Sequence, residues 1–443
     1  MLVNVRAILI LTSIIGLNVS ANAENLSDIY KIAVKNDPVI LAAKANYHAD
    51  KETLKQGRAV LLPQLAGSAN KLEPADPTST NPDKTTYSAS LSQSLFNVPA
   101  WFQFKSAKNM DQVAEATFAA NQQDLIIRVS ETYFNVLRAY ENRQTRQAEL
   151  SAISRQLEQT QERFEVGLLP ITDVYEIQAI FDEATANNLE ANGALDSAFE
   201  KLQSLTGQRH HELSGLKDSF VAVSPDPIDV DSWVQFSLAN NFTLKANQLT
   251  QQAANATAAA AKAQHLPKIT LSTDYSKRDL KPTLNSDGII TEQTSVNLNL
   301  TMPIFSGGLT SSQARQSSFK AKAAEHNYMA AKRNTIQVAR STHQQVITNI
   351  ARVKARKQAI KSAESALQAT QAGYEVGTRN IIDVLLAQRT VFQAKRNVAS
   401  ARYDYILSMM RLKQVAGQLS PEDILEINNW LYSSVIIKSS NSI

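Results

Sequence analysis

The sequence predicts an α+β membrane protein that is built from two repeats of one structural unit. Three observations support this fold class. The two halves of the chain match each other, each half contains a long segment almost free of glycine and proline, and a segment of alternating apolar and small polar residues precedes each of them. This pattern gives four strands per chain. We expect the strands to belong to a membrane β-barrel that several chains complete.

The internal duplication is clearest toward the end of each half. Glu165-Val166-Gly167 matches Glu375-Val376-Gly377, and Gly207-Gln208 matches Gly417-Gln418, at the same offset of 210 residues. A match of this kind without gaps indicates a repeat. The predicted organisation is a first repeat at 24–213, a connector at 214–231, a second repeat at 232–432 and a C-terminal tail at 433–443.

Residues 1–23 have the pattern of a signal peptide. Arg6 provides a positive charge, an apolar stretch runs over residues 7–19, and Ala21-Asn22-Ala23 has the small residues that signal peptidase recognises. We expect cleavage before Glu24. The apolar stretch is shorter than the roughly 20 residues of a spanning helix, so the mature chain is expected to have no helical anchor. The signal by itself also fits a soluble exported protein.

Each repeat is expected to begin with a helix and to end in a helical hairpin with unequal arms. Apart from Pro99 and Gly373 near their ends, the long arms contain no proline or glycine. At 1.5 Å per residue each long arm would extend for about 100 Å. The predicted ranges are 98–166 and 309–373 for the long arms and 172–205 and 382–416 for the return arms. A stripe with a seven-residue period predicts coiled-coil packing; it consists of Val346, Val353, Ile360, Leu367 and Tyr374.

The segment before each long arm has the two-residue period of a β-strand. Between Tyr87 and Leu95, for example, every even position is serine. Strands of about 9 to 11 residues cross a bilayer when they are tilted. The predicted strand pairs are 63–73 with 85–96 and 267–277 with 293–303. The side chains expected to face lipid are Tyr87, Leu91, Leu95, Ile269, Leu271, Val296, Leu298 and Leu300.

A half-buried sheet covered by helices is the general alternative for such strands. It fits poorly here, because helices of about 100 Å cannot lie over strands of about 30 Å. The serine and asparagine face suits a water-filled lumen instead. Because bacterial barrels have at least about eight strands, four cannot close one. Three chains would supply twelve.

Composition and motifs argue against several other functions. A net charge of +4 and the lack of a basic run with aromatic residues give no reason to expect a nucleic acid partner, and the absence of cysteine excludes disulfides and thiolate metal sites. His210-His211-Glu212 is the nearest approach to a metal site, but it lies at a helix end between glycines, and we expect a solvated turn. We find no catalytic constellation, so no enzyme activity, metal or cofactor is expected.

The turns that connect the hairpin arms carry the most informative polar residues. Asp173 and Asp383 each follow a glycine stop at the start of a return arm. One interpretation is that both are helix N-caps, which would explain their presence structurally.

The duplication is broken at the same turns. Tyr374 aligns with Phe164, and Arg379 aligns with Leu169. One hairpin therefore has an additional hydroxyl and an additional guanidinium. A guanidinium needs an acceptor, and the other hairpin offers one in Asp173.

At this point the sequence resembles the outer membrane efflux protein (TolC) family over nearly all of the mature chain. Any one of the shared motifs would be weak evidence, but the ordered and duplicated set is specific. The motifs are Leu62-Pro63-Gln64-Leu65, His265-Leu266-Pro267, Pro303-Ile304-Phe305 followed by Gly307-Gly308, the run from Ala372 to Arg379, Ile382-Asp383-Val384-Leu385, and Asn397-Val398-Ala399 through Tyr405.

The resemblance implies a homotrimer in the outer membrane of a Gram-negative cell. Its lipid-embedded part would be a twelve-stranded β-barrel, continued by a periplasmic barrel of long α-helices. It implies the exit duct of tripartite efflux and type I secretion systems, through which drugs, other small molecules or unfolded proteins pass passively. The implied partners are a periplasmic adaptor (membrane fusion) protein and an inner membrane ABC or RND-type transporter, which would select the cargo.

The resemblance also implies a gate at the periplasmic helix ends. In the family, a tyrosine and an arginine of the inner coil bind a threonine–aspartate pair of the adjacent coil and hold the entrance shut. The residues at these positions are Thr172, Asp173, Tyr374 and Arg379. Breaking these bonds is expected to let the inner hairpin swing outward, as in an iris.

Two stacked rings of aspartate line the entrance in the family. Asp383 supplies one carboxylate ring, but Leu386 occupies the position of the second. Three carboxylates around one axis attract cations. With one ring missing, we expect weaker block by polyvalent cations.

An exported coiled-coil scaffold, or a periplasmic adaptor without its own pore, is the alternative function. Adaptors also have helical hairpins, but they lack two strand pairs with lipid-type alternation. The two possibilities differ in extraction, because a barrel requires detergent and is recovered as a heat-labile trimer.

Overall fold

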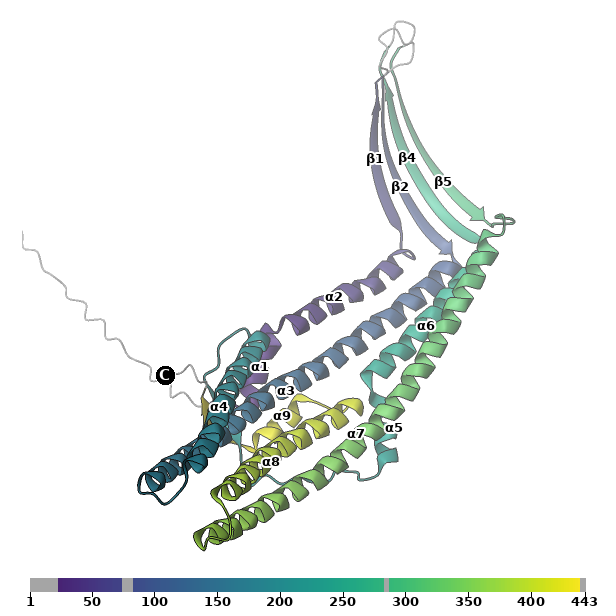
Figure 1. Cartoon of the computed structure of the whole chain (residues 1–443). Coiled ribbons are helices and arrows are strands. Elements are labelled where there is room, and N and C mark those ends of the chain that lie inside the picture. Colours follow the sequence, from purple (N-terminus) through teal and green to yellow (C-terminus); the bar gives the residue numbers. More distant parts are fainter. Residues whose placement is uncertain (1–22, 74–82, 283–286, 439–443) are drawn as a thin grey trace, which may run out of the picture.

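The computed structural model describes residues 23–73, 83–282 and 287–438. The signal peptide predicted at 1–23 lies, except for Ala23, outside the described residues and stays a prediction. The molecule is elongated, with four curved strands at one end and two helical hairpins at the other (Figure 1). No helix in the described part of the chain is long and apolar enough to span a bilayer.

The elements follow the chain as two similar series. The first series is α1 (Leu26–Asn36), α2 (Pro38–Ala59), β1 (Gln64–Leu72), β2 (Lys84–Phe96), α3 (Val98–Glu165), α4 (Ile171–Thr206) and β3 (Glu212–Leu216). The second series is α5 (Val230–Asn240), α6 (Phe242–Lys262), a short 3-10 turn (Ala263–His265), β4 (Lys268–Leu280), β5 (Ile289–Thr301), α7 (Leu309–Glu375), α8 (Ile381–Val415), α9 (Pro421–Asn428) and β6 (Leu431–Lys438).

The long strands form one antiparallel sheet in the order β1-β2-β4-β5. Four helices continue these strands in the same order, since α3 packs against α2 and α6, and α6 packs against α7. Each strand therefore runs into the helix directly below it, as Figure 1 shows. The chain forms an arc of four strands and four helices whose edges are β1 with α2 on one side and β5 with α7 on the other.

The long arms α3 and α7 have 68 and 67 residues, close to the predicted ranges. Asn97 starts α3 by accepting a hydrogen bond from the backbone N–H of Ala100 at 3.1 Å, with proline in the first turn. Gly167 and Gly377 end the long arms with φ of 77°. This left-handed conformation favours glycine and lets the chain reverse into α4 and α8.

Each repeat begins with two helices, where a single one was predicted. Asp37 caps α2 and is followed by Pro38, which breaks the helix because proline has no N–H to continue it. Asn241 caps α6 in the second repeat, accepting from the backbone N–H of Leu244 at 2.9 Å. Side chains that cap a following helix compete with continuation of the preceding one.

The second strand pair extends further toward its tip than predicted. β4 reaches Leu280 and β5 begins at Ile289, so polar residues expected in a loop belong to the ladder. A cross-strand ion pair between Lys277 and Glu292, at 2.8 Å, accompanies this extension. β5 ends at Thr301 and not at 303, since Pro303 has no N–H for a ladder bond.

A small second sheet corrects the predicted connector and tail. β3 includes residues 214–216 of the predicted connector, and β6 includes residues 433–438 of the predicted tail. The two strands pair antiparallel, and Glu24 forms a parallel bridge to Leu213. Residues 439–443 of the tail lie outside the described part of the chain.

The main hydrophobic core lies at mid-length, where α1, α3, α4, α8 and α9 meet the small sheet. Aromatic side chains fill it; Tyr133, Phe134, Tyr403 and Tyr405 are at most 1% exposed. A separate, smaller core joins the two hairpins near their turns. The two cores hold the hairpins together from mid-length to their ends.

Candidate functional site

The two hairpin turns have the same backbone structure. Leu168 N–H donates to the carbonyl of Arg163 at 2.9 Å, and Thr378 N–H donates to the carbonyl of Gly373 at 2.8 Å. Both turns lie at the same end of the molecule (Figure 1). Any functional difference between them must therefore come from their side chains.

Asp173 and Asp383 are not N-caps, as one interpretation of the sequence held. Both occupy the third position of their helices, and the capping residues are Pro170 and Asn380. Asn380 and Asp383 form a capping box, in which the side chain of Asn380 accepts from the N–H of Asp383 at 2.8 Å. Proline supplies no side-chain cap to α4. Asp173 thus keeps a carboxylate that capping does not explain.

The four predicted gate residues are exposed or half-buried at the hairpin ends. Thr172 Oγ1 donates to Asp173 at 3.4 Å, and the guanidinium of Arg379 lies 3.9 Å from the carboxylate of Asp383. Within the described residues of this single chain, no hydrogen bond joins the Thr172–Asp173 pair to Tyr374 or Arg379. The gate network stays a prediction for the assembled protein.

Tyr374 has a different partner in the chain. Arg163 Nη1 donates to the Tyr374 hydroxyl oxygen at 2.8 Å, and its guanidinium lies 5.7 Å from the centre of the tyrosine ring. Sequence reasoning missed Arg163. The available signal was the duplication, which breaks at this position too, because Arg163 aligns with Gly373.

Ion pairs join the hairpins above the turns. Arg389 of α8 contacts Glu183 of α4 at 2.7 Å, and Arg396 of α8 contacts Glu149 of α3 at 2.9 Å. Glu149 also accepts from Arg146 at 3.1 Å, and its side chain is only 6% exposed. Burial and the neighbouring Arg146 lower the pKa of Arg396. These residues were not predicted, since sequence alone does not show which faces of two helices meet.

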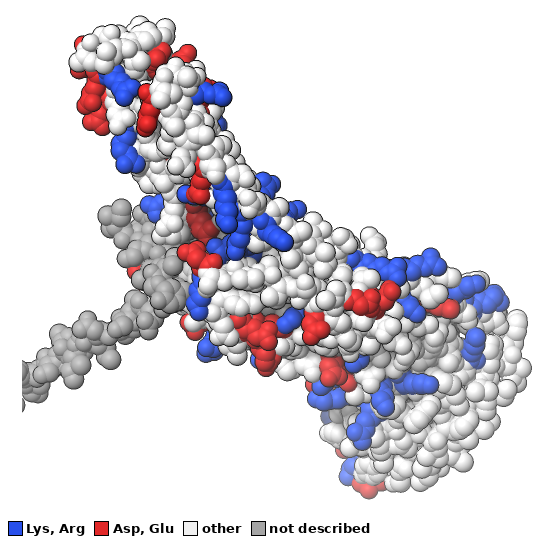
Figure 2. All heavy atoms as spheres, turned by 90° about the horizontal axis from the view of Figure 1, so that it is seen from below, with Lys and Arg blue, Asp and Glu red and all other residues white. Residues whose placement is uncertain are grey.

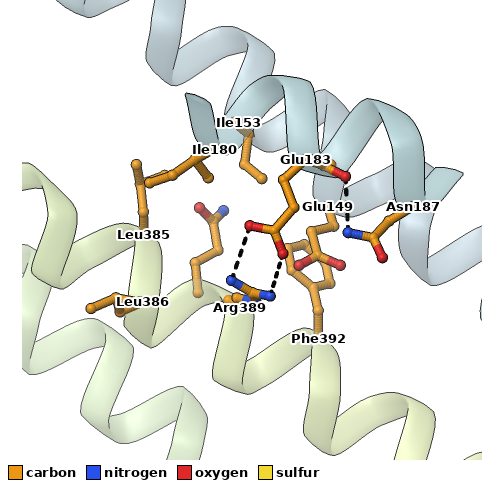
Figure 3. Close-up of a pocket in the computed structure, with 11 residues that line it drawn as sticks. Glu149, Ile153, Ile180, Glu183, Asn187, Leu385, Leu386, Arg389 and Phe392 are labelled. Atoms are coloured by element: carbon orange, nitrogen blue, oxygen red, sulfur yellow. Dashed lines mark hydrogen bonds and ion pairs between the residues drawn. The ribbon is translucent and has the colours of Figure 1, made fainter. Parts of the chain in front are cut away.

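A pocket lies between α4 and α8 beside these pairs (Figure 3). Its apolar wall includes Ile153, Ile180 and Leu385, and the Glu183–Arg389 pair crosses it. Leu386, which occupies the predicted position of the second aspartate ring, also lines this pocket. The two hairpins therefore contact each other around this pocket through apolar side chains and through the Glu183–Arg389 ion pair.

The side chains predicted to face lipid lie along the strands. All of them are exposed except Ile269, which is half-buried. The register places Leu271 opposite Leu298 and Ile269 opposite Leu300, so these pairs share a face. The other face is polar; Ser68 and Ser88 are hydrogen bonded at 2.7 Å, and Asn297 donates to Asp274 at 3.2 Å.

Charges do not gather into a single patch on the face seen from below (Figure 2). Lys and Arg are interspersed with Asp and Glu over the helices. Among the described residues, no group of three His, Asp or Glu side chains is arranged to hold a metal ion. The solvated turn expected at His210-His211-Glu212 is wrong for His210, which is 5% exposed and bonds Glu24 at 2.5 Å and Thr206 at 2.7 Å.

Comparisons with known proteins agree with this architecture. The profile of the outer membrane efflux protein family matches residues 29–208 and 233–418. The outer membrane protein TolC of Vibrio cholerae is 35% identical over 409 residues, which cover 92% of this chain and 93% of that protein. The alkaline protease secretion protein AprF of Pseudomonas aeruginosa is 28% identical and covers 91% and 86%. The crystal structure of the Campylobacter jejuni CmeC outer membrane channel superposes with a TM-score of 0.75 at 18% identity, covering 93% of this chain and 90% of that one.

The chain belongs to the outer membrane efflux protein family, as its motifs predicted. It is an outer membrane channel protein of α+β fold, with a helical tunnel on the periplasmic side. The alternative of a scaffold or adaptor without a pore is therefore set aside.

Proposed function

We propose that three copies of this chain form the exit duct of tripartite efflux and type I secretion systems. The observation that carries this proposal is the arc of four strands continued, in the same order, by four helices. The edge strands β1 and β5 have backbone groups that another copy can pair. Three arcs joined edge to edge give a twelve-stranded barrel above a twelve-helix tunnel.

The duct is passive and works with two other proteins. The inner membrane ABC or RND-type transporter selects the cargo, and it works with a periplasmic adaptor. The relative AprF is named for protease secretion, which supports a protein cargo among others. The duct itself catalyses no reaction and uses no cofactor; outer membrane lipid surrounds the apolar face of the strands.

The gate lies at the hairpin turns. In the assembled trimer, Tyr374 and Arg379 bind the Thr172–Asp173 pair of an adjacent coil, and Asp383 forms a carboxylate ring on the axis. Two observations support this proposal. The side chain of Arg379 is 61% exposed and its contact with Asp383 is long, at 3.9 Å, and Asp173 is not the N-cap of α4, so both side chains can reach a neighbouring hairpin. Opening requires the inner hairpin α7/α8 to move outward from these bonds.

Single-channel current in a planar bilayer tests the duct and the gate together. The wild type should give a small, mostly closed conductance, and Arg379→Ser should increase it. Leu169→Ser, at the equivalent turn position of the other hairpin, is the matched control and should leave the conductance unchanged. Equal conductance in wild type and Arg379→Ser would rule out the gate assignment. A protein released by osmotic shock, with no conductance in any variant, would rule out the duct.

A further inference from the structure

Tyr374 makes a contact that the gate network does not include. Arg163 belongs to the last turn of α3, in the α3/α4 hairpin (the outer hairpin of the proposed gate), whereas Tyr374 belongs to the last turn of α7, in the inner hairpin α7/α8. The guanidinium donates to the hydroxyl oxygen at 2.8 Å, and its central carbon lies 5.7 Å from the centre of the ring. Both the hydroxyl and the ring of Tyr374 are therefore held by the same side chain of the other hairpin.

The surroundings fix this arrangement. The ring of Tyr374 packs against the small core between the hairpins, which includes Leu157 and Ile177. Arg163 is placed favourably at the C-terminal end of α3, where the helix dipole stabilises a cation. The ring of Tyr374 thus packs on apolar side chains, while the guanidinium binds its hydroxyl.

The hydrogen-bond chemistry of the two groups determines what Tyr374 can still do. Arginine has only donors, so the tyrosine oxygen must act as the acceptor in this bond. The single hydroxyl proton of Tyr374 then remains available for another acceptor. A carboxylate such as Asp173 of an adjacent coil is the acceptor that the gate provides, and a hydroxyl that already accepts a charged bond is a stronger donor.

We propose that Arg163 is a positioning residue of the gate, which orients Tyr374 so that its hydroxyl proton points to the neighbouring coil. The proposal rests on the proposed gate function and adds one residue to it. Arg163 connects the outer and inner hairpins within a chain, whereas the gate bonds connect adjacent coils. Release of the inner hairpin therefore requires the Arg163–Tyr374 bond to break as well.

The broken duplication gives independent support. Gly373 stands where the first repeat has Arg163, and a Cβ atom at Gly373 would lie 2.9 Å from Cγ of Arg379. Glycine at this position makes room for Arg379 to lie along the end of α7. The two hairpins have thus diverged at this aligned position. In the first repeat it provides the guanidinium that binds Tyr374, and in the second it provides the space for Arg379.

A double-mutant cycle on the full-length trimer tests the proposal by conductance in a planar bilayer. Arg163→Ala should raise the time-averaged conductance roughly two- to fivefold, as expected for loss of one exposed charged contact. Tyr374→Phe keeps the ring but removes the hydroxyl. The double variant should conduct no more than the larger single variant, because both substitutions remove the same bond. Arg163→Lys should restore the closed state in part.

Arg155→Ala is the matched control, because Arg155 is an exposed arginine of the same helix that bonds its own helix, to the carbonyl of Ser151. It should conduct as the wild type does. If Arg379→Ser raises the conductance but Arg163→Ala does not, or if Arg163→Ala and Tyr374→Phe add independently, Arg163 has no positioning role and the gate still stands. If Arg379→Ser has no effect, the gate itself fails. Heat-labile trimers of Arg163→Ala and Arg163→Lys on a gel exclude misfolding as the cause.

Discussion

Asp37 is a buried carboxylate at the break between α1 and α2, with its side chain 3% exposed. It accepts hydrogen bonds from Arg128 Nη2 at 2.7 Å and from the backbone N–H of Ile40 at 3.1 Å. Burial alone would raise the pKa of Asp37, but the bonds from Arg128 and from backbone amides outweigh it and hold the pKa below its usual value. Asp37 thus stabilises the fold in its charged form.

We expect Asp37→Asn to lower the free energy of unfolding by about 2 kcal/mol at pH 7. Because the pKa is lower in the folded state, the stabilisation is present above the unfolded pKa of about 3.9 and is lost as the pH falls through the folded value. Thermal unfolding in detergent at pH 7 and at about pH 2.5 measures this. Asp124→Asn, which removes the exposed second partner of Arg128, should cost less than about 1 kcal/mol. A difference between wild type and Asp37→Asn that does not shrink in acid contradicts the argument.

At the residue scale, the sequence located the hairpin turns but not their contacts. Broken symmetry between the repeats drew attention to Tyr374 and Arg379. It could not supply the partner of Tyr374, which is 211 positions away in the chain. A seven-residue period identifies which face of a helix is buried, but it does not determine the axial register of one hairpin relative to the other. The contact between Arg163 and Tyr374 depends on that register.

At the scale of elements, α8 is bound to the α3/α4 hairpin by charged pairs that differ in burial, one to α3 and one to α4. Glu149 and Arg396 have side chains 6% and 9% exposed, whereas Glu183 and Arg389 are half exposed and form the pair that crosses the pocket in Figure 3. Removing one partner of a buried pair leaves an uncompensated charge, which costs far more than breaking an exposed pair.

Glu149→Gln should therefore lower the free energy of unfolding by about 3 kcal/mol. Glu183→Gln, the matched control at the exposed pair between α4 and α8, should cost less than about 1 kcal/mol. Thermal unfolding of both variants in the same detergent compares them. Equal effects would mean that burial does not determine the strength of these pairs and that the packing of α3 on α8 depends on other contacts.

The order of elements was largely predictable, because strands and helices have different periods and glycine marks the turns. The sequence did not predict the small sheet of β3 and β6. β3 is only five residues long, and three of these residues, 214–216, were assigned to the connector. Two short strands separated by more than 200 residues have no local signal, and only the folded chain brings them together.

At the scale of the whole molecule, the proposed barrel requires the four-stranded sheet to have one apolar face and one polar face. Val296 lies on the apolar face, opposite Thr273, whereas its neighbour Ser295 lies on the polar face, opposite Asp274. Successive residues of a strand point to opposite faces. In a barrel, one of these positions meets lipid and the next one meets water.

Val296→Arg should prevent or strongly reduce assembly of the heat-labile trimer in the outer membrane, since an arginine facing lipid near the middle of a barrel costs about 2 to 4 kcal/mol in each chain. Ser295→Arg carries the same charge into the lumen beside Asp274 and should assemble as the wild type does. The amounts of trimer in outer membrane fractions, compared before and after heating, measure the difference. Equal assembly of the two variants would mean that Val296 does not face lipid. Loss of assembly only in Ser295→Arg would mean that the sheet is oriented the other way, with its serine face outward.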